Sequence, residues 1–194
     1  MSKKLVRGLV FVVFISLMPL ITSGCGSRCK EPIRERPFKA TALLLDVATF
    51  PTSWRQTSSG RISSGPLGGS MAIERFETFF DSSDALAFHQ VYRYACSPQA
   101  IHEYGELRKA EYKDTPRGSD WKVPAIASTW NTFADESYLA CGTSGSEQRC
   151  KAIARYEEYV VEFYSHMSST TFSLSDLQSV LKTMDSNIGR VISK

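Results

Sequence analysis

Residues 71–96, MAIERFETFFDSSDALAFHQVYRYAC, decide the fold. Two runs rich in aromatic residues, 71–80 and 86–96, lie on either side of the turn-forming residues DSSD. Four large side chains of the second run recur at period two, with Gln90 interrupting them: Leu86, Phe88, Tyr92 and Tyr94. Because such alternation is typical of a half-buried strand, the stretch predicts an antiparallel hairpin.

Two helices are expected beside this hairpin. One follows it directly, over residues 99–112. The other covers residues 173–192 and carries an apolar stripe at spacings of three and four, made of Leu174, Leu177, Leu181, Met184, Ile188 and Ile192. Its start offers two alternative capping boxes, Ser173 with Asp176 or Ser175 with Gln178. The pattern of the second helix predicts an amphipathic helix that lies on a sheet.

Three more strands fit residues 134–141, 149–156 and 159–167. Together with the hairpin and the helices they predict an α+β fold, an antiparallel sheet with two main helices packed on one face. Residues 41–194 are expected to form this single domain. Within it, residues 56–70, QTSSGRISSGPLGGS, have the composition of a flexible loop.

The charge balance argues against one class of partner. Three of the 23 basic residues lie in the first 24 positions, which leaves 20 basic against 20 acidic residues in the rest of the 194-residue chain. A nucleic-acid-binding domain usually carries a clustered basic surface. We therefore expect no nucleic-acid partner.

The first 25 residues have the three-part layout of a secretory signal. A cationic start, MSKKLVR, is followed by an apolar run over residues 8–21 and then by small polar residues and a cysteine. The apolar run has 14 residues, whereas a membrane-spanning helix needs about 20. Residues 1–24 are therefore interpreted as a signal peptide.

The end of this segment, Thr22-Ser23-Gly24-Cys25, resembles the lipobox of bacterial lipoproteins, although Thr22 stands where that family prefers leucine. The resemblance implies cleavage before Cys25 and acylation of its thiol by chains such as palmitate. It also implies a cell-envelope lipoprotein, with the bilayer as partner of the acylated N-terminus and the domain on the extracytoplasmic side of the cell membrane. Ordinary cleavage near Gly24, with Cys25 left as a thiol, is the alternative.

Residues 25–40 are expected to form the lipid-anchored tether. Two prolines prevent helix propagation there, and basic residues exceed acidic ones by three. These charges either meet anionic lipid head groups or belong to a solvated linker.

The cysteine count fits an exported protein. If Cys25 of the five cysteines is acylated, four remain, enough for two disulfides in an oxidising compartment. Cys141 and Cys150 flank a Gly/Ser-rich loop and are the first expected pair, which leaves Cys29 with Cys96 by elimination. A zinc site is discounted because the C-x-x-C spacing does not occur.

The sequence offers no catalytic motif. Among His89, His102 and His166, only His102 has acidic neighbours on one helix, Glu103 and Glu106, and we expect a solvated helix face there. The acid pairs 81/84, 135/136 and 157/158 fall in predicted turns or strand ends and are expected to be solvated. These observations favour a non-enzymatic binding or scaffolding domain without cofactor or metal, for an unknown protein or small-molecule partner. The alternatives are a small-ligand carrier or sensor domain, or a hydrolase whose site is scattered along the sequence.

Overall fold

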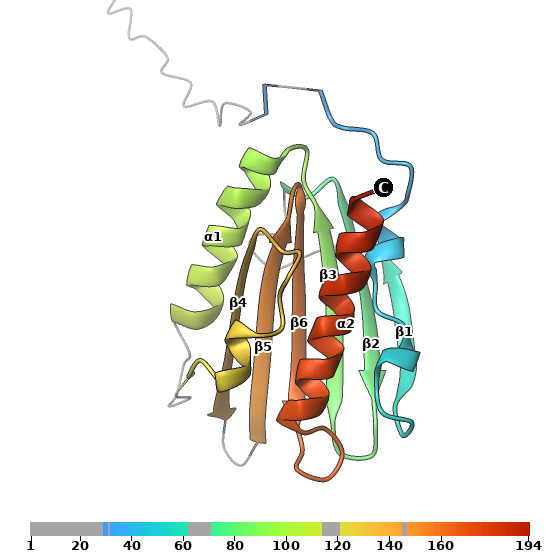
Figure 1. Ribbon diagram of the computed structural model, residues 1–194, viewed down its shortest axis with the longest axis vertical. Coiled ribbons are helices and arrows are strands. Elements are labelled where there is room, and N and C mark those ends of the chain that lie inside the picture. The colour runs from blue at the N-terminus through green and yellow to red at the C-terminus, as the bar shows by residue number, and fades with distance from the viewer. Residues whose placement is uncertain (1–28, 31, 62–70, 114–120, 145–146) are drawn as a thin grey trace, which may run out of the picture.

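The computed structural model describes residues 29, 30, 32–61, 71–113, 121–144 and 147–194 (Figure 1). The elements follow in the order η1 (Ala40–Leu43), η2 (Val47–Thr49), β1 (Arg55–Arg61), β2 (Glu74–Asp81), β3 (Leu86–Arg93), α1 (Ser97–Lys113), η4 (Ala125–Ser128), β4 (Glu136–Ser144), β5 (Glu147–Tyr156), β6 (Tyr159–Met167) and α2 (Leu174–Ile192). Among these residues no helix is long and apolar enough to span a bilayer.

The six strands form one sheet in the order β1-β2-β3-β6-β5-β4, and every neighbouring pair is antiparallel. The predicted hairpin is β2–β3, paired from Glu74 opposite Arg93 to Asp81 opposite Leu86. The three later strands also form, but β4 runs to Ser144 and β5 begins at Glu147, so both extend into the expected Gly/Ser-rich loop. The α+β fold with an antiparallel sheet is thus confirmed.

Helix α2 covers one face of the sheet (Figure 1). It begins with the capping box of Ser173 and Asp176, one of the two expected. Five residues of the predicted stripe are buried: Leu177, Leu181, Met184, Ile188 and Ile192. They share a core cluster with Ala152, Ala154, Val161 and Phe163 of the sheet. Each such side chain contributes roughly 1.5 to 3 kcal/mol by burial, so α2 supplies much of the stability of the domain.

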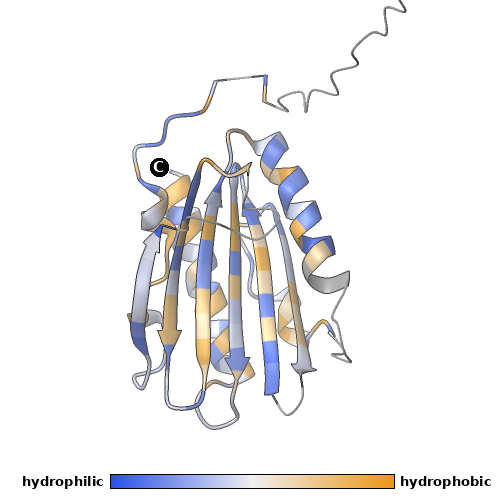
Figure 2. Cartoon of the chain, turned by 180° about the vertical axis from the view of Figure 1, so that it is seen from behind, coloured by the Kyte–Doolittle hydropathy of each residue, from blue (hydrophilic) through white to orange (hydrophobic). Residues whose placement is uncertain are grey.

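Helix α1 packs on the opposite face, and the expectation of two helices on one face is wrong. Ile153 of β5 belongs to the cluster of Tyr104 and Leu107 of α1, whereas its neighbours Ala152 and Ala154 belong to the α2 cluster. Successive side chains of a strand point to opposite faces. The back view shows the sheet in front of α2 (Figure 2). The physical reason is that β5 and β6 place two apolar side chains, Ile153 and Val160, on the face opposite α2, where α1 buries them.

Two segments expected to be irregular carry structure. Residues 56–61 of the predicted loop belong to β1, an edge strand whose exposed polar side chains gave no strand signal. The rest of that loop, residues 62–70, lies outside the described residues. In the predicted tether, Ala40 is fully buried and the side chain of Arg36 is 3% exposed. Cys29, Lys30 and residues 32–40, here called the N-terminal strap, therefore belong to the domain.

Candidate functional site

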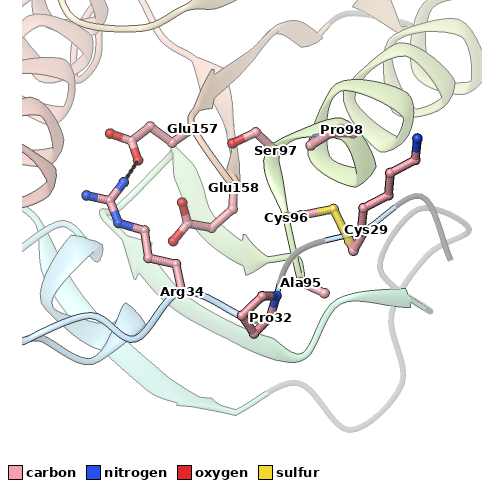
Figure 3. Close-up of a pocket in the computed structure, with 10 residues that line it drawn as sticks. Cys29, Pro32, Arg34, Ala95, Cys96, Ser97, Pro98, Glu157 and Glu158 are labelled. Carbon is pink, nitrogen blue, oxygen red and sulfur yellow. Dashed lines mark hydrogen bonds and ion pairs between the residues drawn. A yellow bond between two sulfur atoms is a disulfide. The ribbon is translucent and has the colours of Figure 1, made fainter.

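A cavity of about 510 Å³ lies at one end of the sheet (Figure 3). Three pieces of chain surround it, namely the N-terminal strap, the start of α1 and the β5–β6 turn. Its lining residues are Cys29, Lys30, Pro32, Arg34, Ala95, Cys96, Ser97, Pro98, Glu157 and Glu158. The volume lies within the roughly 300 to 1,000 Å³ that is usual for small-molecule sites.

A disulfide between Cys29 and Cys96 forms one wall of this cavity. It ties the strap to the residue that precedes α1. The structure also contains the Cys141–Cys150 bond, whose two residues lie directly opposite each other on β4 and β5. Both bonds match the pairing expected from the cysteine count.

A network of ion pairs forms the adjoining wall. The guanidinium of Arg36 donates to both carboxylate oxygens of Glu158, from Nε at 2.7 Å and from Nη2 at 2.6 Å, and also to Glu157. Arg34 Nη1 donates to Glu157 Oε2 at 2.7 Å. Arg93 contributes positive charge, with its Nε 3.9 Å from Glu158 Oε1. The cavity is therefore held in shape by charged groups from the strap, β3 and the β5–β6 turn.

The ion pair between Arg36 and Glu158 shifts the pKa of both groups. The hydrogen bond to Glu158 raises the pKa of Arg36 well above its ordinary value, against the opposing effect of burial. For Glu158, burial would raise the pKa, but the Arg36 hydrogen bond and the charges of Arg36 and Arg93 outweigh it and lower the pKa. Both groups are charged at neutral pH.

The 157/158 acid pair was expected to be solvated, and for Glu158 this is wrong. Glu158 is 4% exposed, and Arg36 of the strap and Arg93 of β3 pair with its carboxylate. Glu157 adopts a left-handed backbone with φ of 51°, a conformation that costs a non-glycine residue roughly 1 to 2 kcal/mol. The turn thus carries backbone strain at the position where Glu157 meets both strap arginines.

A second feature lies on the face of the sheet that also carries α1. A row of contacting rings crosses three strands there: Phe79, Phe88, Tyr164 and His166. Beside it, Lys151 Nζ and Glu162 Oε2 form a buried ion pair at 3.0 Å. Gln90, the interruption in the aromatic pattern, accepts from the Tyr92 hydroxyl and donates to Glu77. The interruption therefore marks a polar row on this face, which the sequence pattern did not predict.

The three histidines lie far apart in the fold. His89 is buried in the α2-side core, where its Nδ1 accepts the Leu45 N–H at 3.0 Å and burial lowers its pKa to about 3. His102 Nε2 is 3.9 Å from Glu103 Oε1. His166 Nδ1 is 3.5 Å from Glu147 Oε2. Across the described part of the chain, no three His, Cys, Asp or Glu side chains converge as metal ligands.

Residues 1–24, which the sequence analysis interprets as a signal peptide, and Cys25 lie outside the described residues. The described part of the chain is a disulfide-bonded α+β domain, as its sheet and its two disulfides show. Comparisons with protein-family models and with curated proteins find no match. Among solved structures, the chain is similar to the extracellular domain of PknH from Mycobacterium tuberculosis, with a TM-score of 0.55 and 11% identity over 81% of this chain and 98% of that chain. At this identity the likeness concerns the fold.

Proposed function

We propose that the chain is a cell-envelope lipoprotein, anchored through an acylated Cys25, whose single domain binds a partner outside the cytoplasm. The observation that carries the proposal is the pairing of the cysteines. Two disulfides use Cys29, Cys96, Cys141 and Cys150, and such bonds persist in oxidising, extracytoplasmic compartments. The remaining cysteine is Cys25, at the end of the lipobox-like segment. The fold shared with an extracellular domain supports the same location.

Binding is favoured over catalysis by the state of the charged groups at the cavity. A general acid at neutral pH needs a carboxyl group whose pKa is raised. The arginines instead lower the pKa of Glu158 and hold it in ion pairs. The cavity is therefore a preformed surface for recognition whose wall includes paired charges.

The same surface favours a partner over a carried apolar ligand. The cavity wall consists of ion pairs, a disulfide and the start of a helix. A carrier of small apolar molecules would need a large apolar cavity beneath the sheet. The space beneath the sheet on the α2 side is instead filled by the side chains of the larger core cluster.

Replacing Cys25 tests the anchor, because the thiol is the acyl acceptor. We expect Cys25→Ala to abolish incorporation of a labelled fatty acid and to leave the protein unprocessed or released from the membrane. The matched control is the double variant Cys29→Ala with Cys96→Ala, which removes two other cysteines and should keep the label. Persistent labelling of the Cys25→Ala protein contradicts the proposal.

A further inference from the structure

The geometry points to the cavity end of the domain as a membrane-docking surface, with Lys30 and Arg34 bound to the phosphates of an anionic phospholipid bilayer. This inference rests on the proposed acylation of Cys25. It adds an orientation and a partner chemistry that anchoring alone does not supply. The docking surface consists of Lys30, Ile33 and Arg34 of the strap.

The first argument is the length of chain between the anchor and the domain. Four residues carry the chain from Cys25 to Cys29, and a fully extended chain covers at most about 14 Å in four residues. Cys29 is bonded to Cys96, with 5.6 Å between their Cα atoms. The start of α1 is therefore held close to the bilayer whatever path the four residues take.

The second argument is that the strap cannot detach from the domain and so extend the tether. Beyond Cys29 it is fixed to the body of the domain by Arg36, which pairs with Glu158 and donates to the Ile192 carbonyl at the end of α2. The disulfide holds the strap on one side of the cavity (Figure 3), and the Arg36 contacts hold the strap again beyond Arg34. A free tether would let the domain turn, whereas this one fixes which end faces the membrane.

The shape of the domain makes this orientation measurable. The start of α1, the β5–β6 turn and the end of α2 lie at one end of the long axis, and the β2–β3 turn lies at the other (Figure 1). Strands rise about 3.3 Å per residue, and β5 has 10 residues. The two ends are thus separated by roughly 30 Å, and only the cavity end is within reach of the anchored bilayer.

The third argument is the chemistry of the exposed strap. Lys30 is exposed, the side chain of Arg34 is 66% exposed, and Ile33 is 52% exposed between the two cations. A guanidinium has five N–H donors, and Glu157 engages Arg34 through Nη1 only. Glu35 and Glu157 carry negative charge at the same end. Lys30 and Arg34 nevertheless lie on the strap itself, and among the charged residues that the structure describes they are the two nearest to Cys25 in the chain.

Photocrosslinking of the full-length acylated protein tests the orientation. Benzoylphenylalanine is placed at Ile33 or, as the matched control, at the exposed Ser83 of the β2–β3 turn, in vesicles of phosphatidylglycerol and phosphatidylethanolamine. We expect at least tenfold more phospholipid adduct from position 33 than from position 83. Equal yields from the two positions, or more from position 83, would overturn the inference.

Charge reversal tests the phosphate contact. Near an anionic surface each cation adds roughly a fivefold preference, so Lys30→Glu should lower the adduct yield from position 33 several-fold on phosphatidylglycerol vesicles. Lys182→Glu changes an exposed lysine of α2 and should leave the yield unchanged. Equal effects of the two variants would overturn the phosphate contact. Loss of fatty-acid label from the unaltered protein instead contradicts the proposed function, so the two failures are distinguishable.

Discussion

At the scale of single residues, buried carboxylates hold segments that come from distant parts of the chain. Asp185 of α2 is 1% exposed. It accepts the backbone N–H groups of Thr132, Phe133 and Ala134 and the hydroxyl of Tyr156, the last at 3.0 Å. One side chain thus fixes the segment that enters β4 against the helix.

Replacing this carboxylate should be costly. In Asp185→Asn one oxygen becomes an NH2 group, which faces N–H donors and cannot accept from them. We expect a loss of about 2 to 4 kcal/mol in the free energy of unfolding, because hydrogen bonds to charged groups are worth roughly 1.5 to 3 kcal/mol each. The control Asp46→Asn, at an exposed cap of η2, should cost no more than about 1 kcal/mol. Chemical denaturation measures both, and similar values for the two variants would refute the anchoring role of Asp185.

At the scale of elements, the exposure of side chains on α1 could not be predicted without knowing which face of the helix packs on the sheet. Residues 102, 103 and 106 were expected on one solvated face. The side chain of Glu106 is indeed 50% exposed, whereas that of Glu103 is 7% exposed. Glu103 lies on the side of the helix that meets the sheet. Burial raises the pKa of the Tyr94 hydroxyl, and the negative charge of Glu103 raises it further. The helix therefore carries a buried carboxylate on its inner side.

The two glutamates of α1 should differ in their effect on stability. Glu103→Ala is expected to destabilise the domain by about 1 to 3 kcal/mol, because it leaves buried polar neighbours without their partner. Glu106→Ala removes an exposed charge and should stay within about 0.5 kcal/mol. Thermal unfolding of the two variants beside the unaltered protein measures the difference. A Glu103→Ala protein that melts like the Glu106→Ala protein would show that the inner side of α1 is solvated after all.

At the scale of the whole molecule, the two disulfides constrain the chain very differently. Cys29–Cys96 closes a loop over a sequence separation of 67, from the strap across the first three strands to the start of α1. Cys141–Cys150 spans a separation of only 9 within one hairpin. Loop-closure entropy grows with the length of the loop. The Cys29–Cys96 bond therefore lowers the conformational entropy of the unfolded chain more. It also holds the strap that lines the cavity.

We expect the two bonds to contribute unequally to stability. Removing the first with Cys29→Ala and Cys96→Ala should cost about 4 kcal/mol, and removing the second with Cys141→Ala and Cys150→Ala about 2.5 kcal/mol, on the loop-entropy model. Denaturant unfolding of the double variants measures both values. If removing Cys141–Cys150 costs more, the loop-entropy model fails for this domain. The hairpin disulfide would then act mainly by stabilising the packing of the native state.

The sequence by itself determined the local elements and the covalent framework. Period-two alternation predicted the β2–β3 hairpin. Apolar residues at spacings of three and four, with the capping residues Ser173 and Asp176, predicted α2. These signals depend on neighbours a few residues apart, whose geometry is fixed by the backbone. With Cys25 set aside, the Gly/Ser-rich loop between Cys141 and Cys150 indicated one pair and left Cys29 with Cys96 by elimination, and the structure contains both bonds.

Only the tertiary structure decided which surface each element meets. Alternation shows that residues share a face, but it does not show what covers that face, so the placement of α1 opposite α2 could not be read from the pattern. The candidate site was missed for the same reason. Glu158 meets Arg36 across 122 residues of sequence, and whether a carboxylate is solvated or buried depends on whether such a distant partner neutralises it.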